Sequence, residues 1–168
     1  MSVPINMGLD ADGVFIWPPG FNLGKRVTRI DEVDTRLYHF SRFKLLRMIF
    51  YSLVRPNPEM IDLTKERKQR GDRIIIISGH SNLCIREFEI YLTKIGMPFD
   101  DICLFDPNNF ISYLEFKLQT IIELKCDVYI EDLKAVVDYL RENLDGQCQV
   151  IHYPGPGFID RVEQALIN

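Results

Sequence analysis

Two aspartates separated by one residue follow the first apolar run of the sequence. They stand in the segment Asp10-Ala11-Asp12-Gly13. A calcium loop of the EF-hand type also begins Asp-x-Asp, but it needs Gly at its sixth position and Glu at its twelfth, where this chain has Phe15 and Phe21. Two interpretations stay open: a turn, which Asp and Gly favour, and a catalytic pair in which one carboxylate attacks and the other moves protons.

Three further polar positions lie next to apolar runs and could join this pair. Ser78 follows four consecutive isoleucines, and the acidic pair Glu131-Asp132 follows another apolar run. Lys117 lies shortly before that second run and is flanked by apolar residues. A hydroxyl, an ammonium group and extra carboxylates are the groups that bind phosphoryl oxygens and a hard cation.

The apolar runs alternate with helical segments along most of the chain. We expect strands at 3–9, 74–77, 102–105, 127–130 and 149–151, and helices at 34–54, 58–70, 81–95, 110–125, 133–144 and 158–167. This alternation predicts an α/β fold of three layers, a Rossmann-like parallel sheet with helices on both faces. Ligands bind at the carboxyl ends of strands in such sheets, which is where the polar residues named above fall.

In the order and spacing of these motifs the chain resembles the haloacid dehalogenase superfamily of phosphatases. Met7 to Val14 resembles its first motif, an apolar strand followed by Asp-x-Asp-Gly. The run ending at Ser78 resembles the second, Lys117 the third, and Val128 to Asp132 the fourth. Lys125 and Lys134 are the competitors for the third motif, and the fourth often has two aspartates where this chain begins with Glu131.

The resemblance implies a role for each matched residue. Asp10 would attack phosphorus and form an aspartyl phosphate, and Asp12 would protonate the leaving oxygen and later activate water. Ser78, Gly79 and Lys117 would hold the phosphate. A dianionic phosphate beside two carboxylates requires a divalent cation, and the oxygen ligands favour Mg²⁺. Its protein ligands would be Asp10, the backbone carbonyl of Asp12, and either Glu131 or Asp132.

His80 has two competing interpretations. A basic residue often follows the second motif of these phosphatases at this offset, so His80 would touch the substrate. The alternative is a loop histidine near the N-terminus of a helix.

We predict a single domain, residues 1–168, with a small helical cap insert at 14–57, where this superfamily carries caps that control substrate access. Residues 21–58 hold eight Lys or Arg against three acidic residues, which gives a local charge of +5 in a chain of net charge −4. Aromatic residues are interleaved with these basic residues. The block therefore indicates an anionic partner, such as a nucleotide or a nucleic acid, or a solvated face.

The composition excludes several classes of protein. The chain is 46% hydrophobic and 26% charged, which is ordinary for a globular protein and unlike a disordered or collagen-like chain. No two of the four cysteines form a CxxC pair, so a zinc site is not expected. We see no signal peptide or transmembrane stretch and expect a cytoplasmic protein.

The sequence therefore favours a Mg²⁺-dependent phosphomonoesterase acting on a phosphorylated small molecule or nucleotide. The alternatives are a phosphatase of polynucleotide ends that uses the basic block, and a binding protein of the same fold with little activity. A dehalogenase is less consistent with the sequence, because it does not need Asp12 or the acidic pair Glu131-Asp132.

Overall fold

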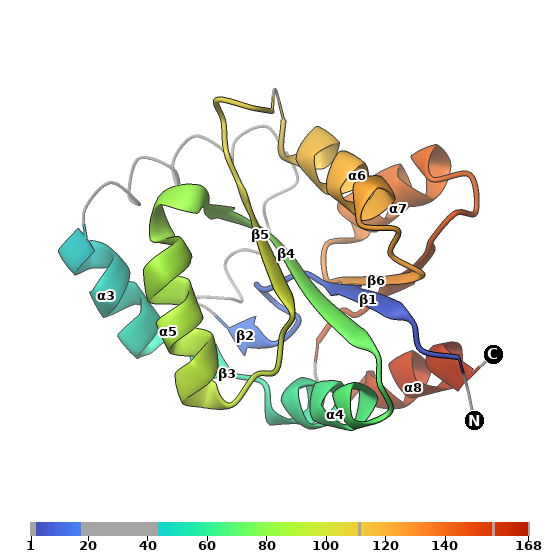
Figure 1. The fold of residues 1–168 in the computed structure, drawn as a ribbon, viewed down its shortest axis with the longest axis horizontal. Helices are drawn as coiled ribbons and strands as arrows, with labels where there is room; N and C mark the ends of the chain where they lie inside the picture. Colours follow the sequence, from blue (N-terminus) through green and yellow to red (C-terminus); the bar gives the residue numbers. More distant parts are fainter. Residues whose placement is uncertain (1–2, 18–43, 111, 156, 168) are drawn as a thin grey trace.

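A five-stranded parallel sheet forms the centre of the molecule, which we describe from a computed structural model. Residues 3–17, 44–110, 112–155 and 157–167 are described, without the side chains of 44–48 and 167. The strands lie in the order β5-β4-β1-β6-β7 (Figure 1). Their bounds are Asn6–Leu9 for β1, Arg73–Ser81 for β4, Asp101–Phe105 for β5, Val128–Glu131 for β6 and Gln149–His152 for β7.

Helices cover both faces of this sheet, which confirms the predicted three-layer architecture. The helices α4 (Pro58–Gln69), α5 (Ile85–Ile95) and α8 (Ile159–Ile167) pack on one face, and α6 (Tyr113–Glu123) and α7 (Lys134–Asn143) on the other. The four isoleucines of β4 show why: Ile74 and Ile76 enter one core, and Ile75 and Ile77 enter the other. No helix in the described ranges is both long and apolar enough to cross a membrane.

The middle strand β1 is the point at which the chain changes direction across the sheet. It pairs with β4 on one side and with β6 on the other, so that Leu9 lies beside both Ile76 and Ile130. From β4 the chain continues outward to β5, and from β6 it continues to β7 on the opposite side. The carboxyl ends of β1, β4 and β6 therefore meet at a topological switch point, the usual place for a ligand in such sheets.

The strand β4 is longer than predicted. The four isoleucines predict a strand at 74–77, but β4 continues to Ser81, and its register against β5 shifts between Ser78 and Ser81. A single-turn 3₁₀ helix, Asn82–Cys84, then leads into α5. The expectation that His80 lies in a loop before a helix is thus wrong, since the bulged strand keeps it in the sheet.

The first strand is shorter than predicted. The apolar run from Val3 suggests a strand at 3–9, whereas β1 begins at Asn6. Pro4 has no backbone N–H to donate to a neighbouring strand, and Val3 is 81% exposed. Ile5 instead donates its N–H to the Asp72 side chain at 2.9 Å.

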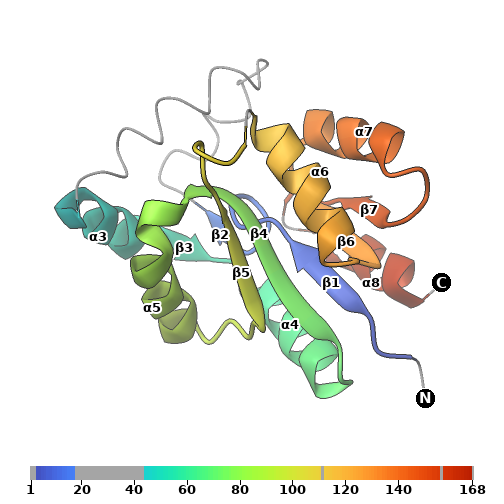
Figure 2. The same cartoon turned by 45° about the horizontal axis from the view of Figure 1, so that its top comes forward.

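The two ends of the predicted insert, 14–57, lie side by side. The short strands β2 (Ile16–Trp17) and β3 (Arg55–Pro56) pair antiparallel, and α3 (Lys44–Leu53) leads into β3 (Figure 2). Buried Asn57 donates to the Val14 carbonyl at 2.7 Å and to the Tyr153 hydroxyl at 2.8 Å. Most of the basic block, and the predicted helix at 34–54 as far as residue 43, lie outside the described residues.

Candidate active site

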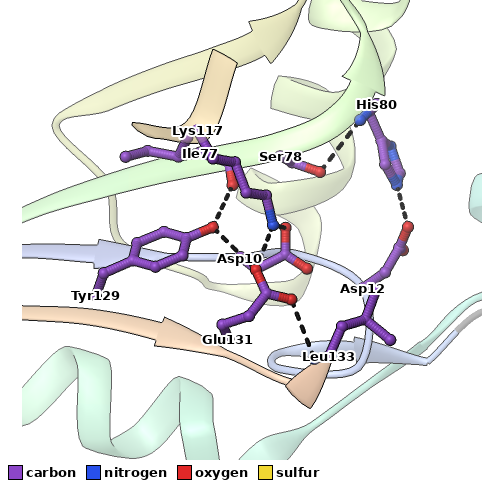
Figure 3. A network of polar contacts seen from close by, with 9 residues as sticks. All are labelled: Asp10, Asp12, Ile77, Ser78, His80, Lys117, Tyr129, Glu131 and Leu133. Atoms are coloured by element: carbon purple, nitrogen blue, oxygen red, sulfur yellow. Dashed lines mark hydrogen bonds and ion pairs between the residues drawn. The ribbon is translucent and has the colours of Figure 1, made fainter. Parts of the chain in front are cut away.

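Lys117 joins two carboxylates from different strands inside the molecule (Figure 3). Its fully buried ammonium Nζ donates to Asp10 Oδ1 at 2.9 Å and to Glu131 Oε2. Asp10 follows β1, Glu131 ends β6, and Lys117 lies on α6. Of the three lysines considered from the sequence, Lys117 is the one brought here, whereas Lys134 pairs with Asp138 on an exposed face.

The surroundings of Lys117 keep it charged. Burial alone would lower the pKa of the Lys117 ammonium, but the carboxylates of Asp10 and Glu131 outweigh burial and raise it. The ring of Tyr113 lies 4.4 Å from Nζ and adds a cation–π contact. An ammonium has three N–H donors, so one remains for a phosphoryl oxygen after the two carboxylates are bound.

The adjacent residues Glu131 and Asp132 have different partners. Both oxygens of Glu131 accept hydrogen bonds: Oε2 from Lys117 and from the Tyr129 hydroxyl, and Oε1 from the Leu133 N–H at 3.1 Å. The Asp132 carboxylate accepts no hydrogen bond from the described residues. Glu131 therefore holds Lys117 in place, whereas both oxygens of Asp132 are without a hydrogen-bond donor in this part of the chain.

The carboxylates of Asp10, Glu131 and Asp132 form a cluster suited to a cation. One oxygen of each lies within 4.8 Å of the others. Burial, opposed by Lys117 and reinforced by Glu131, raises the pKa of Asp10 to about 7, and burial followed by repulsion from Glu131 and Asp10 raises that of Asp132 to about 9. A hard divalent ion would relieve this repulsion, so the donor set fits Mg²⁺.

The turn after β1 depends on Gly13. Its backbone is left-handed, with φ +78°, and its N–H donates to the Ile16 carbonyl at 2.8 Å. A Cβ atom at this position would collide with the carboxylate of Asp132. Gly13 therefore allows the turn that carries Asp12 to approach the end of β6.

The end of β4 supplies the predicted phosphate-binding residues. Ser78 is buried, and its Oγ accepts the His80 N–H at 3.3 Å. A Cβ atom on Gly79 would strike the ring of Tyr113, so a glycine is needed where α6 crosses this strand. Ser78 and Asp10 lie at the same end of neighbouring strands.

His80 lies between Asp12 and an element of the predicted insert. Its Nε2 is 3.0 Å from Asp12 Oδ2, and its Nδ1 is 2.8 Å from the hydroxyl of Tyr51 on α3. Burial alone would lower the pKa of His80, but Asp12 and then Tyr51 outweigh it and hold that pKa well above its usual range.

Comparison with known proteins shows the fold and does not show a family. No family model matches the sequence, and no curated protein matches it. Among solved structures, the HAD domain of the effector protein Lem4 from Legionella pneumophila superposes with a TM-score of 0.58 at 12% identity, covering 98% of this chain and 94% of that one. A haloacid dehalogenase-like family hydrolase from Streptococcus pneumoniae superposes with a TM-score of 0.57 at 14% identity, covering 97% and 98%. This chain has a haloacid dehalogenase-like fold.

A longer protein shares the same fold. A chain of the Pnkp1/Rnl/Hen1 RNA repair complex superposes with a TM-score of 0.61 at 18% identity. The match covers 89% of this chain but only 42% of that one, so the present chain spans less than half of its length.

Four residues around the candidate site were not found from the sequence. The spacing of Tyr129 and Tyr113 from site residues could have indicated them. Tyr129 stands two residues before Glu131 on the same face of β6, and Tyr113 stands four residues before Lys117 on α6. Tyr51 and His152 have none, because their contacts depend on tertiary packing. His152 donates from Nε2 to the Asp132 carbonyl at 3.0 Å and so fixes the backbone beside the metal candidates.

Proposed function

We propose that this protein is a Mg²⁺-dependent phosphomonoesterase with Asp10 as its nucleophile. The observation that carries the proposal is the buried contact of Lys117 with Asp10 and Glu131, beside the carboxylate of Asp132, which accepts no hydrogen bond within the described ranges. Burying an ammonium and three carboxylates together costs free energy. Binding of a phosphoryl group and a cation would explain why the fold keeps this cluster despite its cost.

Two steps account for the reaction. In the first, a carboxylate oxygen of Asp10 forms a bond to phosphorus while the ester P–O bond breaks, and Asp12 gives its proton to the leaving oxygen. In the second, Asp12 takes a proton from water as the water attacks the aspartyl phosphate, releasing inorganic phosphate and the Asp10 carboxylate. Lys117 and Ser78 stabilise the phosphoryl oxygens as charge develops on them.

The proposed cation site would consist of oxygen ligands from the turn after β1 and from the end of β6. Asp10 and Asp132 would supply carboxylate oxygens and Asp12 its backbone carbonyl, while Glu131 would orient Lys117. When bound, Mg²⁺ neutralises the negative charge shared by the phosphate and the carboxylates.

A phosphorylated small molecule or a nucleotide is the proposed class of substrate. The predicted cap at 14–57 would control access to the site, and its basic block makes a polynucleotide end the second class to test. The likeness to a chain from an RNA repair complex is a likeness of fold at 18% identity. It is therefore a reason to include RNA ends in a screen.

Phosphate release in the presence of Mg²⁺ tests the proposal. The substrates are p-nitrophenyl phosphate, sugar phosphates, nucleotides, and DNA and RNA with phosphorylated ends. We expect EDTA and Asp10→Asn to abolish release, whereas Asp138→Asn, the same change at an exposed carboxylate on α7, leaves it intact. Mg²⁺ binding without turnover of any substrate would instead identify a binding protein of this fold.

A further inference from the structure

The ring of His80 is held from both sides within the candidate site. Its side chain is 10% exposed and lies between Asp12, in the turn after β1, and Tyr51, on α3. Both ring nitrogens are engaged, one by each neighbour. In this arrangement His80 has no nitrogen left for a phosphate of the substrate.

The polar contacts around His80 keep a proton on the side facing Asp12. The Tyr51 hydroxyl also lies 3.5 Å from Cys84 Sγ, and Cys84 Sγ donates to the Ser81 carbonyl at 2.7 Å. If the imidazole is neutral, Tyr51 donates to Nδ1, and Nε2 carries the hydrogen. If it is charged, Nδ1 donates to Tyr51, which donates to Cys84. An ionised carboxylate can only accept, so in both states Nε2–H donates to Asp12.

Aromatic packing fixes the plane of the imidazole. The ring centroids of Phe88, Phe50 and Tyr51 lie 5.1, 5.9 and 5.9 Å from that of His80. Tyr51 is stacked in turn on Tyr91 of α5 at 5.4 Å. A rotation of His80 would disturb this cluster, so the direction of its Nε2–H bond is set by the packing of α3 on α5.

The contact distinguishes the two oxygens of Asp12. His80 occupies Oδ2, whereas Oδ1 is buried and has no partner among the described residues. We propose that His80, held by Tyr51, is the positioning residue for Asp12, and that it leaves Oδ1 as the oxygen that exchanges the proton with the leaving group. This inference rests on the proposed phosphatase function and deepens it, because it connects one end of the predicted insert to the proton-transfer step.

Dependence on the leaving group separates this role from a merely structural one. Proton donation matters most for a poor leaving group such as an alkoxide and little for p-nitrophenolate, which leaves without it. Loss of the His80 contact should therefore lower kcat/KM for an alkyl phosphate far more than for p-nitrophenyl phosphate. A general loss of folded protein would lower both by the same factor.

The variants His80→Phe and His80→Gln test the contact directly. Phe keeps a ring of similar size without the N–H, and the amide of Gln places a donor near the position of Nε2. We expect His80→Phe to lower kcat/KM for the alkyl phosphate by about 10²-fold, and for p-nitrophenyl phosphate by less than about 5-fold. His80→Gln should recover part of the loss on the alkyl substrate.

The hydroxyls of Tyr51 and Tyr91 provide a matched pair for the second test. Each substitution by Phe keeps the stacked rings and removes one hydroxyl. Among the described residues, the hydroxyl of Tyr51 contacts His80, whereas that of Tyr91 has no hydrogen-bond partner. We expect Tyr51→Phe to lower kcat/KM for the alkyl phosphate by about 3- to 10-fold, and Tyr91→Phe, whose hydroxyl senses the Asp12 charge without bonding to His80, to lower it by less.

The outcomes separate this proposal from the proposed function. If the wild type releases no phosphate, the function fails, and the role of His80 fails with it. If the wild type is active but His80→Phe affects alkyl and aryl phosphates equally, or Tyr51→Phe behaves like Tyr91→Phe, only the positioning role is overturned. In an Asp12→Asn background, His80→Phe should have no further effect on kcat/KM.

Discussion

A single buried ammonium balances the charges of the site. Lys117 is the cation that contacts both Asp10 and Glu131 in the described part of the chain, and all three side chains are almost completely buried. Removing one partner of such a group leaves the others buried without compensation, which costs more than an intact cluster contributes. The stability of the core near the carboxyl ends of β1 and β6 should therefore depend on this one side chain.

The substitution Lys117→Met tests this dependence. We expect a loss of about 3–5 kcal/mol in the free energy of unfolding at pH 7, measured by urea denaturation. The loss should shrink toward pH 4, because Asp10, whose pKa is raised to about 7, is then protonated. Lys134→Met, which breaks an exposed pair with Asp138, should cost less than about 1 kcal/mol. Equal losses for the two variants would contradict a charge-balancing role for Lys117.

At the scale of elements, the turn after β1 has to approach the end of β6. Gly13 has a left-handed backbone and lies against Asp132, whereas Gly146 has nearly the same conformation, with φ +75°, and open space around it. A side chain would strain the left-handed backbone at both positions, but at Gly13 it would also collide with Asp132, a proposed metal ligand. They therefore separate backbone strain from an effect on the site.

We expect Gly13→Ala and Gly146→Ala each to lose about 1–2 kcal/mol of stability from the left-handed conformation, with a further loss for Gly13→Ala because Asp132 must move. Only Gly13→Ala should weaken the increase in melting temperature that Mg²⁺ produces, since Gly146 is remote from the carboxylate cluster. A full Mg²⁺ response in Gly13→Ala would show that Asp132 does not need its position beside this turn.

The elements could be predicted from the sequence where burial leaves a pattern. Four successive isoleucines indicate a strand covered on both faces, and Ile74 to Ile77 divide between the two cores as expected. The end of β4 differs from the prediction, because the run of isoleucines stops at Ile77, while pairing of Ser81 with Phe105 extends the strand. The short strands β2 and β3 leave no periodicity, since each has two residues.

At the scale of the whole molecule, the strand order brings together residues that are distant in the sequence. The residues that this order alone places could be predicted from the sequence. Asp10, Ser78 and Glu131 follow apolar runs, so a parallel sheet places them at one edge wherever the helices lie. The partners of His80 and Glu131 could not be predicted in the same way. Tyr51 reaches His80 only because α3 packs on α5. The different roles of Glu131 and Asp132 depend on which of the two carboxylates Lys117 contacts.

The carboxylate cluster should also set how the stability of the whole molecule responds to pH. The pKa of Asp10 is raised from 3.8 to about 7, and that of Asp132 from 3.8 to about 9. Between pH 3.8 and its raised pKa, each carboxyl keeps its proton in the folded protein and releases it in the unfolded chain. Their contribution to stability is therefore complete below about pH 4 and is lost as the pH rises through 7 and toward 9. A bound divalent cation would reverse this trend, because it favours the ionised carboxylates.

The substitution Asp132→Asn separates this contribution from other titrating groups. Without metal, we expect the variant to exceed the wild type in unfolding free energy by about 1–3 kcal/mol at pH 8, since the amide needs no proton where the wild-type Asp132, with its pKa raised to about 9, must take one up on folding, and to match it at pH 4. Added Mg²⁺ should raise the melting temperature of the wild type at pH 8 and leave the variant unchanged. A variant that is less stable than the metal-free wild type at pH 8 would show that Asp132 is not repelled by its neighbours, and one that keeps the Mg²⁺ response would show that Asp132 is not a ligand. The comparison needs no substrate, so it tests the cation site even before an activity is found.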